Sequence, residues 1–222
     1  MGRRFALIVF ALFAASVLSV GTLAVRIHET HSYRYTFLLW NLFLAWLPLI
    51  AASSAFALAR RRVGALVVGL LVVWVLFFPN APYVLTDFKH LNENANGASP
   101  LWYDALMVAS FAWTALMLGF ASLYLVHVIV ARHAKAAVGW VVVVCVLGLA
   151  SFGVYIGRFA HFNSWDVFTR PGHVLSVIGQ DTDSPLHDPK MLGALLALTV
   201  SLLVGYLAVY AFSALRLDFS EA

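Results

Sequence analysis

The chain has 222 residues, of which 63% are hydrophobic and only 11% are charged. A soluble domain usually carries about 25% charged residues, so this composition excludes an ordinary soluble protein and predicts a membrane protein. The formal net charge is +4, but no basic stripe interleaved with aromatic residues accompanies it. Nucleic acid is therefore excluded as a partner, and the charge fits basic residues held in cytoplasmic loops.

Six apolar stretches are long enough to cross a bilayer as helices, which takes about 20 residues each. The stretches are continuous rather than alternating, which predicts helices and not a β-barrel. The predicted fold is an all-α polytopic membrane helix bundle that forms a single transmembrane domain, residues 1–222. The spans are expected at residues 5–25, 35–58, 63–78, 101–130, 138–156 and 191–215.

The first span follows Arg3 and Arg4, a pattern that retained helices share with cleaved signal peptides. Its apolar run of about 20 residues exceeds the usual signal core of about 7–15 residues, which favours a retained helix. The third span stops early, at Pro79 and Pro82, because proline lacks the N–H that a helix needs. We expect it either to be a short span or to continue into a proline-containing stretch that other helices shield within the membrane.

The basic residues divide into two groups along the chain. The group in short segments has eight members: Arg3, Arg4, Arg60, Arg61, Arg62, Arg132, Lys135 and Arg216. The other six are spread over longer loops that also hold most of the acids, in segments 26–34, 79–104 and 158–190. The positive-inside rule places the first group in the cytoplasm, so both termini are expected to be cytoplasmic and the three polar segments to lie outside.

The densest polar stretch runs from Pro79 to His90. Asp87 and His90 are three residues apart, so a helix there would place both side chains on one face. Such a pair could bind a divalent metal or act as acid and base. Alternatively, Asp87 caps or pairs locally and His90 lies in an interfacial helix.

Two further charged residues stand at span ends. Asp104 follows Trp102 and Tyr103, which are typical of the membrane–water boundary. It either complements the positive end of a helix or points inward to meet an arginine. Arg158 either reaches out to water or joins a buried ionic cluster with Asp87, Asp104 or Asp166. His127, near the cytoplasmic side, is expected to be interfacial.

Three motifs carry a resemblance to a known family. They are Pro-Asn-Ala-Pro-Tyr-Val-Leu-Thr-Asp at 79–87, Trp-Tyr-Asp at 102–104, and Gly-Arg-Phe followed by Asn-Ser-Trp-Asp at 157–166. The chain resembles a bacterial integral membrane protein family known as domain of unknown function 1361. The resemblance implies a multi-pass protein of the bacterial cytoplasmic (inner) membrane and brings no established activity. It also leads us to expect arginine where His161 stands.

These observations predict a polar site on the outer side of the bundle. Its expected catalytic residues are Asp87, Arg158 and Asp166, and a metal would be held by His90 together with Asp87. Its expected binding residues are Asn80, Tyr83, Thr86, Asp104, Asn163 and Trp165. The leading hypothesis is an enzyme or binding module for a lipid head group or small polar molecule, with membrane lipids as partners. The alternatives are a small-solute transporter or channel component, and a scaffold whose polar clusters only fix helix packing.

Overall fold

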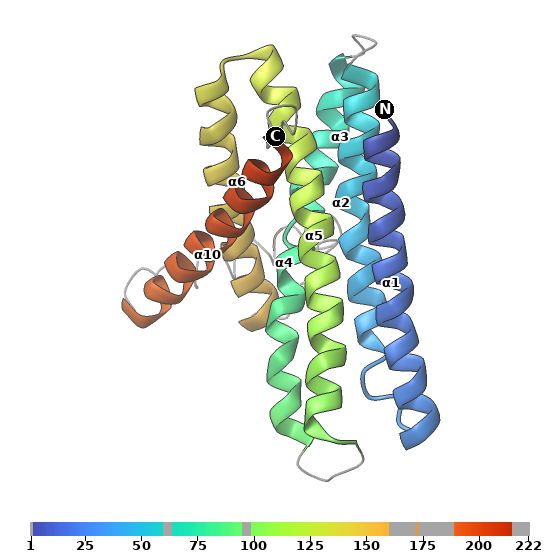
Figure 1. Ribbon diagram of the computed structural model, residues 1–222. Coiled ribbons are helices and arrows are strands. Elements are labelled where there is room, and N and C mark those ends of the chain that lie inside the picture. The colour runs from blue at the N-terminus through green and yellow to red at the C-terminus, as the bar shows by residue number, and fades with distance from the viewer. Residues whose placement is uncertain (1, 60–63, 95–98, 160–171, 173–188, 215–222) are drawn as a thin grey trace, which may run out of the picture.

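The computed structural model describes residues 2–59, 64–94, 99–159, 172 and 189–214. Over these residues the chain is helical without a strand, and six helical segments are long and apolar enough to cross a membrane. The predicted all-α membrane helix bundle is therefore confirmed. The elements are α1 Arg3–Thr30, α2 Phe37–Ala59, α3 Gly64–Phe77, α4 Asn80–Tyr83, the 3-10 helix η1 Val84–Asn94, α5 Leu101–His133, α6 Ala136–Phe159 and α10 Pro189–Ala214 (Figure 1).

A tight reversal joins α1 to α2. His31 adopts a left-handed conformation, with φ of 50°, and its N–H donates to the carbonyl of Ile27 at 2.8 Å. This geometry is a common way to end a helix. The chain then turns and enters α2 at Phe37, so the end of α1 and the start of α2 lie at the same end of the bundle (Figure 1).

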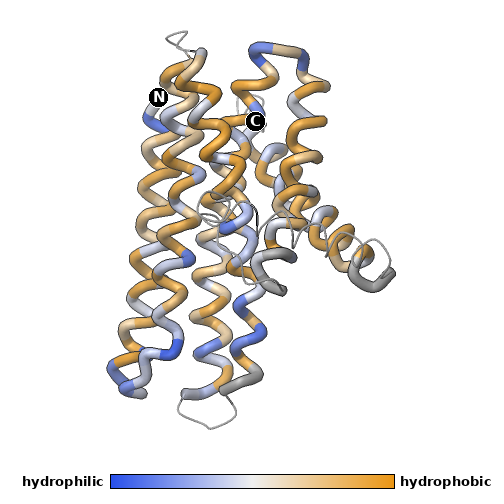
Figure 2. Tube along the Cα trace, turned by 180° about the vertical axis from the view of Figure 1, so that it is seen from behind, coloured by the Kyte–Doolittle hydropathy of each residue, from blue (hydrophilic) through white to orange (hydrophobic). Residues whose placement is uncertain are grey.

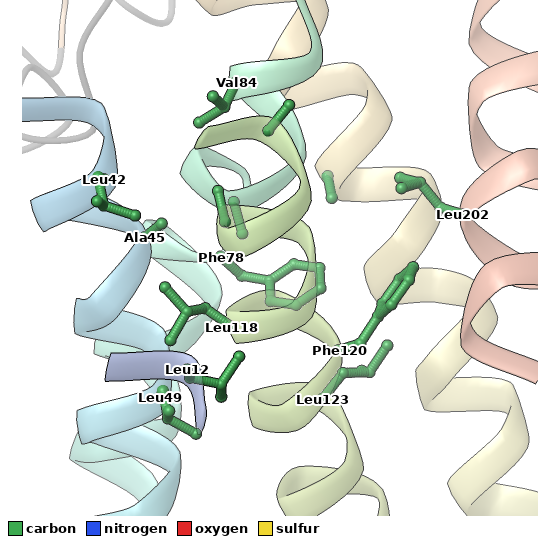
Figure 3. Close-up of a cluster of buried hydrophobic side chains, with 14 of the residues drawn as sticks. Leu12, Leu42, Ala45, Leu49, Phe78, Val84, Leu118, Phe120, Leu123 and Leu202 are labelled. Carbon is green, nitrogen blue, oxygen red and sulfur yellow. The ribbon is translucent and has the colours of Figure 1, made fainter. Parts of the chain in front are cut away.

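Helix α5 is the centre of the bundle and packs against α1, α2, α4, α6, α10 and η1. Figure 3 shows Phe78 and Leu118 in the apolar core between α2 and α5, with Leu12 of α1 beside them. Polar contacts also hold the helices together: Ser19 and Thr114 place their hydroxyl oxygens 3.4 Å apart. Such contacts matter in lipid, where apolar burial alone does not drive helix association.

The third span does not end where its regular helix ends. Helix α3 stops at Phe77, and the chain continues through α4 and η1, so that 64–91 together is long and apolar enough to cross a membrane. A Cβ added to Gly119 of α5 would lie 2.8 Å from the Cβ of Ala81, and one added to Gly153 of α6 would lie 2.9 Å from the Cβ of Pro79. Of the two alternatives, the structure thus supports a proline-containing stretch shielded by other helices.

At the other end of α5, an aromatic cluster attaches α10 to the bundle. His127 is buried, its Nδ1 lies 2.9 Å from the hydroxyl of Tyr206, and its ring stacks on Tyr210. Trp140 of α6 meets the same histidine edge-on, at 4.7 Å between ring centroids. Helices α6 and α10 thus enclose His127 against α5, and its position at the membrane–water interface stays a prediction.

Hydropathy is distributed as a membrane requires. Apolar residues fill the length of the helices and polar residues gather towards their ends (Figure 2). Large apolar side chains such as Phe10, Phe13 and Trp113 are exposed on the outside of the bundle, as expected for surfaces that face lipid. The last residues of α1, the end of η1 and the start of α5 lie at one end of the bundle, opposite the N-terminus (Figure 1). That this end faces outward stays a prediction.

Candidate functional site

An ion pair joins α1 to α5 close to the polar end of the bundle. Arg26 donates from Nε to Oδ1 of Asp104 at 2.7 Å and from Nη2 to Oδ2 at 3.3 Å. The two side chains are 1% and 0% exposed. A two-point pair of this kind fixes the direction as well as the position of the guanidinium. Asp104, in the first turn of α5, thus points inward and meets an arginine.

Arg26 was absent from the predicted site, although the sequence carried a signal for it. The buried positions of α1 are Leu12, Ser16, Ser19, Leu23 and Arg26. Their spacing of four and three residues marks one face of a helix. Continued beyond Leu23, this spacing places Arg26 on the buried face and leaves its polar neighbours exposed.

Tyr35 connects this ion pair to η1. The guanidinium carbon of Arg26 lies 4.5 Å from the centre of the Tyr35 ring, in a cation–π arrangement. The hydroxyl of Tyr35 donates to the backbone carbonyl of His90 at 3.2 Å. Because Tyr35 is fully buried, its ring stabilises the positive charge where water does not reach it.

Asp87 is a second buried carboxylate. It is 1% exposed, and Asn41 donates from Nδ2 to its Oδ2 at 2.9 Å. Asn41 lies near the start of α2, which places this contact close to the same end of the bundle as the ion pair. Asn41 was not among the predicted site residues, because the sequence does not show which helix faces Asp87.

His90 and Asp87 lie on one face of η1. A 3-10 helix has three residues per turn, so side chains three apart are aligned. His90 is partly buried, and its ring lies 5.0 Å from the ring of Phe37. Among the residues placed by the structure, no group of three or more His, Cys, Asp or Glu side chains could hold a metal. A metal at Asp87 and His90 therefore stays a prediction.

Asn80, Tyr83 and Thr86 shape the stretch that leads to Asp87. Asn80 donates from Nδ2 to the carbonyl of Phe77 at 2.9 Å, and Thr86 donates its hydroxyl to the carbonyl of Tyr83 at 2.8 Å. Each side chain bonds to the backbone carbonyl three residues before it, a local contact that Asn and Thr make where the chain leaves a regular α-helix. The contacts position Asp87 through the local fold of the chain.

The side chains of four predicted site residues lie outside the part of the chain that the structure describes. Arg158 lies in the last turn of α6, with its side chain outside the described residues. Asn163, Trp165 and Asp166 also lie outside the described residues. The predicted meeting of Arg158 and Asp166 with the two buried carboxylates therefore stays a prediction.

Six side chains form what we call the boundary cluster: Arg26, Tyr35, Asn41, Asp87, His90 and Asp104. They come from α1, the α1–α2 turn, α2, η1 and α5. The cluster combines a fixed cation, two buried carboxylates and an amide donor. Nη1 of Arg26 is the one side-chain nitrogen or oxygen atom, among the buried atoms that the structure describes, without a hydrogen-bond partner. Chemically, such a cluster can bind polar ligands or exchange protons.

The family described as "Protein of unknown function (DUF1361)" matches this chain over residues 40–207, which is more than half of its length. Asn41, Asp87, His90 and Asp104 fall inside this range, whereas Arg26 and Tyr35 precede it. No curated protein and no solved structure matches the chain significantly.

Proposed function

The chain belongs to the DUF1361 family, and we propose that this integral membrane protein binds or acts on a lipid head group or small polar molecule at its boundary cluster. One observation carries the proposal. Asp87 and Asp104, the two acids among the buried residues that the structure describes, are 1% and 0% exposed inside a mainly apolar bundle. Ionisable groups buried at membrane depth are costly, and they commonly mark ligand or proton pathways.

The binding and enzymatic versions of this proposal use the same residues. In the binding version, the cluster and the Asn80–Thr86 stretch recognise a polar head group. In the enzymatic version, Asp87 is a general base or, with His90, a metal ligand. Arg158 then holds an anionic group and Asp166 assists. The hydrogen bond from Asn41 holds one oxygen of Asp87 in place, which suits either role.

Native mass spectrometry with elemental analysis of the purified protein tests the proposal. The wild type is expected to retain a lipid or small polar molecule, or a stoichiometric metal if the metal version is correct. Asp87→Asn should lose that ligand while it keeps its helical content and melting temperature. Thr36→Val, which changes an exposed residue at the same end, should retain it.

Two outcomes would contradict the proposal. A wild-type spectrum without any bound molecule or metal removes its basis. Loss of folding on Asp87→Asn and on Asp87→Ala assigns the cluster to helix packing, which is the scaffold alternative.

A transporter is the second candidate, because the third span is interrupted. Helix α3 gives way to α4 and η1 at Pro79 and Pro82, inside the bundle. Interrupted helices form the substrate sites of many transporters. Counter-flow of a small solute in proteoliposomes, abolished by Asp87→Asn, would support this candidate. Tight liposomes with no flux of any offered solute would contradict it.

A further inference from the structure

The guanidinium of Arg26 uses only part of its donor capacity. Arginine has five N–H groups in a planar fork. Two of them, on Nε and Nη2, are directed at the carboxylate of Asp104. Nη1 is buried and has no acceptor within the described part of the chain. A buried charged donor without a partner costs more than an uncharged one, so an acceptor is to be expected there.

The geometry restricts where that acceptor stands. Since Asp104 covers the Nε–Nη2 edge, the open edge is the one formed by Nη1 and the second hydrogen of Nη2. The guanidinium carbon also lies over the ring of Tyr35, 4.5 Å from its centre. Because the N–H groups of a guanidinium lie in its plane, an acceptor must approach in that plane. There it faces two parallel N–H groups, one on Nη1 and one on Nη2.

We propose that this second edge of Arg26 binds two oxygens of a phosphate or carboxylate group. Planar, two-point recognition of these anions is the property that separates arginine from lysine. Asp104 is then a positioning residue, because it binds the Nε–Nη2 edge of Arg26 and so fixes the direction in which the other edge points. The inference rests on the proposed function and names the chemistry of its ligand.

Two features favour an anion that enters from the membrane boundary. Helix α5 begins at Leu101 without a side-chain cap, so the positive end of its dipole lies one turn from Asp104 and attracts negative charge. Arg26 itself is 1% exposed, so bulk water does not supply the acceptor directly. The anion enters between helix ends, as the head group of an anionic lipid or as a free anion.

Binding of two probes to the purified protein in nanodiscs tests the inference. One probe is inorganic phosphate, added to discs of phosphatidylcholine. The other is phosphatidylglycerol, mixed into the discs and detected as retained lipid. Arg26→Lys should weaken binding roughly tenfold or more, as expected from the loss of a charged hydrogen bond. Lysine can still pair with Asp104, but its ammonium group is a point charge and has no second pair of parallel N–H groups for an anion.

Arg34→Lys is the matched control, since Arg34 is an exposed arginine at the same end. It should bind both probes as the wild type does. Binding of phosphate indicates a free anion as the ligand, and retention of phosphatidylglycerol alone indicates a lipid. Equal binding by Arg26→Lys and the wild type overturns the inference.

The outcome separates this inference from the proposed function. If the wild type retains a molecule of its own but binds neither probe, the anion inference fails and the proposed function stands. A wild type that retains nothing and binds neither probe overturns both. If Arg26→Lys does not fold, ¹⁵N-arginine spectra of the wild type decide. A buried guanidinium signal should shift when the probe is added, and an unchanged signal overturns the inference.

Discussion

Arg26 and Asp104 are 78 residues apart in the sequence and form a two-point ion pair that is at most 1% exposed. The pair fastens the end of α1 to the beginning of α5, the central helix of the bundle. Tyr35 joins the pair to η1, because its ring makes a cation–π contact with the same guanidinium and its hydroxyl donates to the carbonyl of His90.

Removal of either partner of the ion pair should destabilise the fold. Arg26→Leu or Asp104→Leu leaves one buried charge without its main partner, which typically costs about 3–5 kcal/mol. The double variant should be more stable than the sum of the two losses predicts, because neither charge remains. Unfolding in mixed detergent measures this as a double-mutant cycle. Strictly additive losses would show that the two side chains do not interact.

Asn41→Leu should weaken the bundle where α2 meets η1. The variant removes the amide that donates to Asp87 at 2.9 Å, and a hydrogen bond to a charged group is worth about 1.5–3 kcal/mol. The free energy of unfolding should fall by this amount. Thr36→Leu, at an exposed position immediately before α2, should change it little. Equal effects of the two variants would contradict the contact.

Two glycines of α6 should respond in opposite ways to alanine. In Gly153→Ala the new Cβ would lie 2.9 Å from Pro79, a contact that forces the interrupted third span to shift. Overpacking of this kind costs about 1–3 kcal/mol. Gly148 has nothing within 4 Å, so Gly148→Ala should stabilise by about 0.5–1 kcal/mol through helix propensity. Melting temperatures of both variants test this. A lower melting temperature for Gly148→Ala, with that of Gly153→Ala unchanged, would contradict the packing described.

Tyr206→Phe should loosen α10 without affecting the boundary cluster. The change removes the hydroxyl that lies 2.9 Å from Nδ1 of His127, at a cost of about 1 kcal/mol. Limited proteolysis should therefore cut near α10 sooner than in the wild type. Ligand retention should be unchanged, because His127 lies near the opposite end of α5. Altered retention at normal stability would mean that the two ends are coupled.

Cysteine labelling should show the polar end on the outside of the cell. In a Cys145→Ala background, Glu29→Cys and Lys89→Cys place single thiols at exposed positions of one end, and Lys135→Cys places one at the other. A membrane-impermeant maleimide should label the first two in intact cells. Lys135→Cys should react only after permeabilisation. The reverse pattern would invert the orientation, and labelling of Glu29→Cys and Lys89→Cys from different sides would refute the bundle.

Three residues of the boundary cluster, Asp87, His90 and Asp104, could be anticipated from the sequence, and the partners of the two carboxylates could not. Asp87 and Asp104 stood out because acids are rare in apolar chains, and both prove to be buried. Arg26 did not stand out, because it begins the polar segment 26–34, which was expected outside the spans, whereas the structure places it on the buried face of α1. Asn41 did not stand out either, because the sequence does not show that the start of α2 faces Asp87 of η1.

The sequence by itself determined the class of the protein and the existence of its membrane helices. Continuous apolar length is a local property, and in lipid only a helix satisfies the backbone of such a segment. Only the tertiary structure decided that Arg26 meets Asp104, that Asn41 meets Asp87, and that His127 is enclosed by α6 and α10. These contacts depend on how each helix is rotated about its axis when it packs, and that rotation is set by all its neighbours at once.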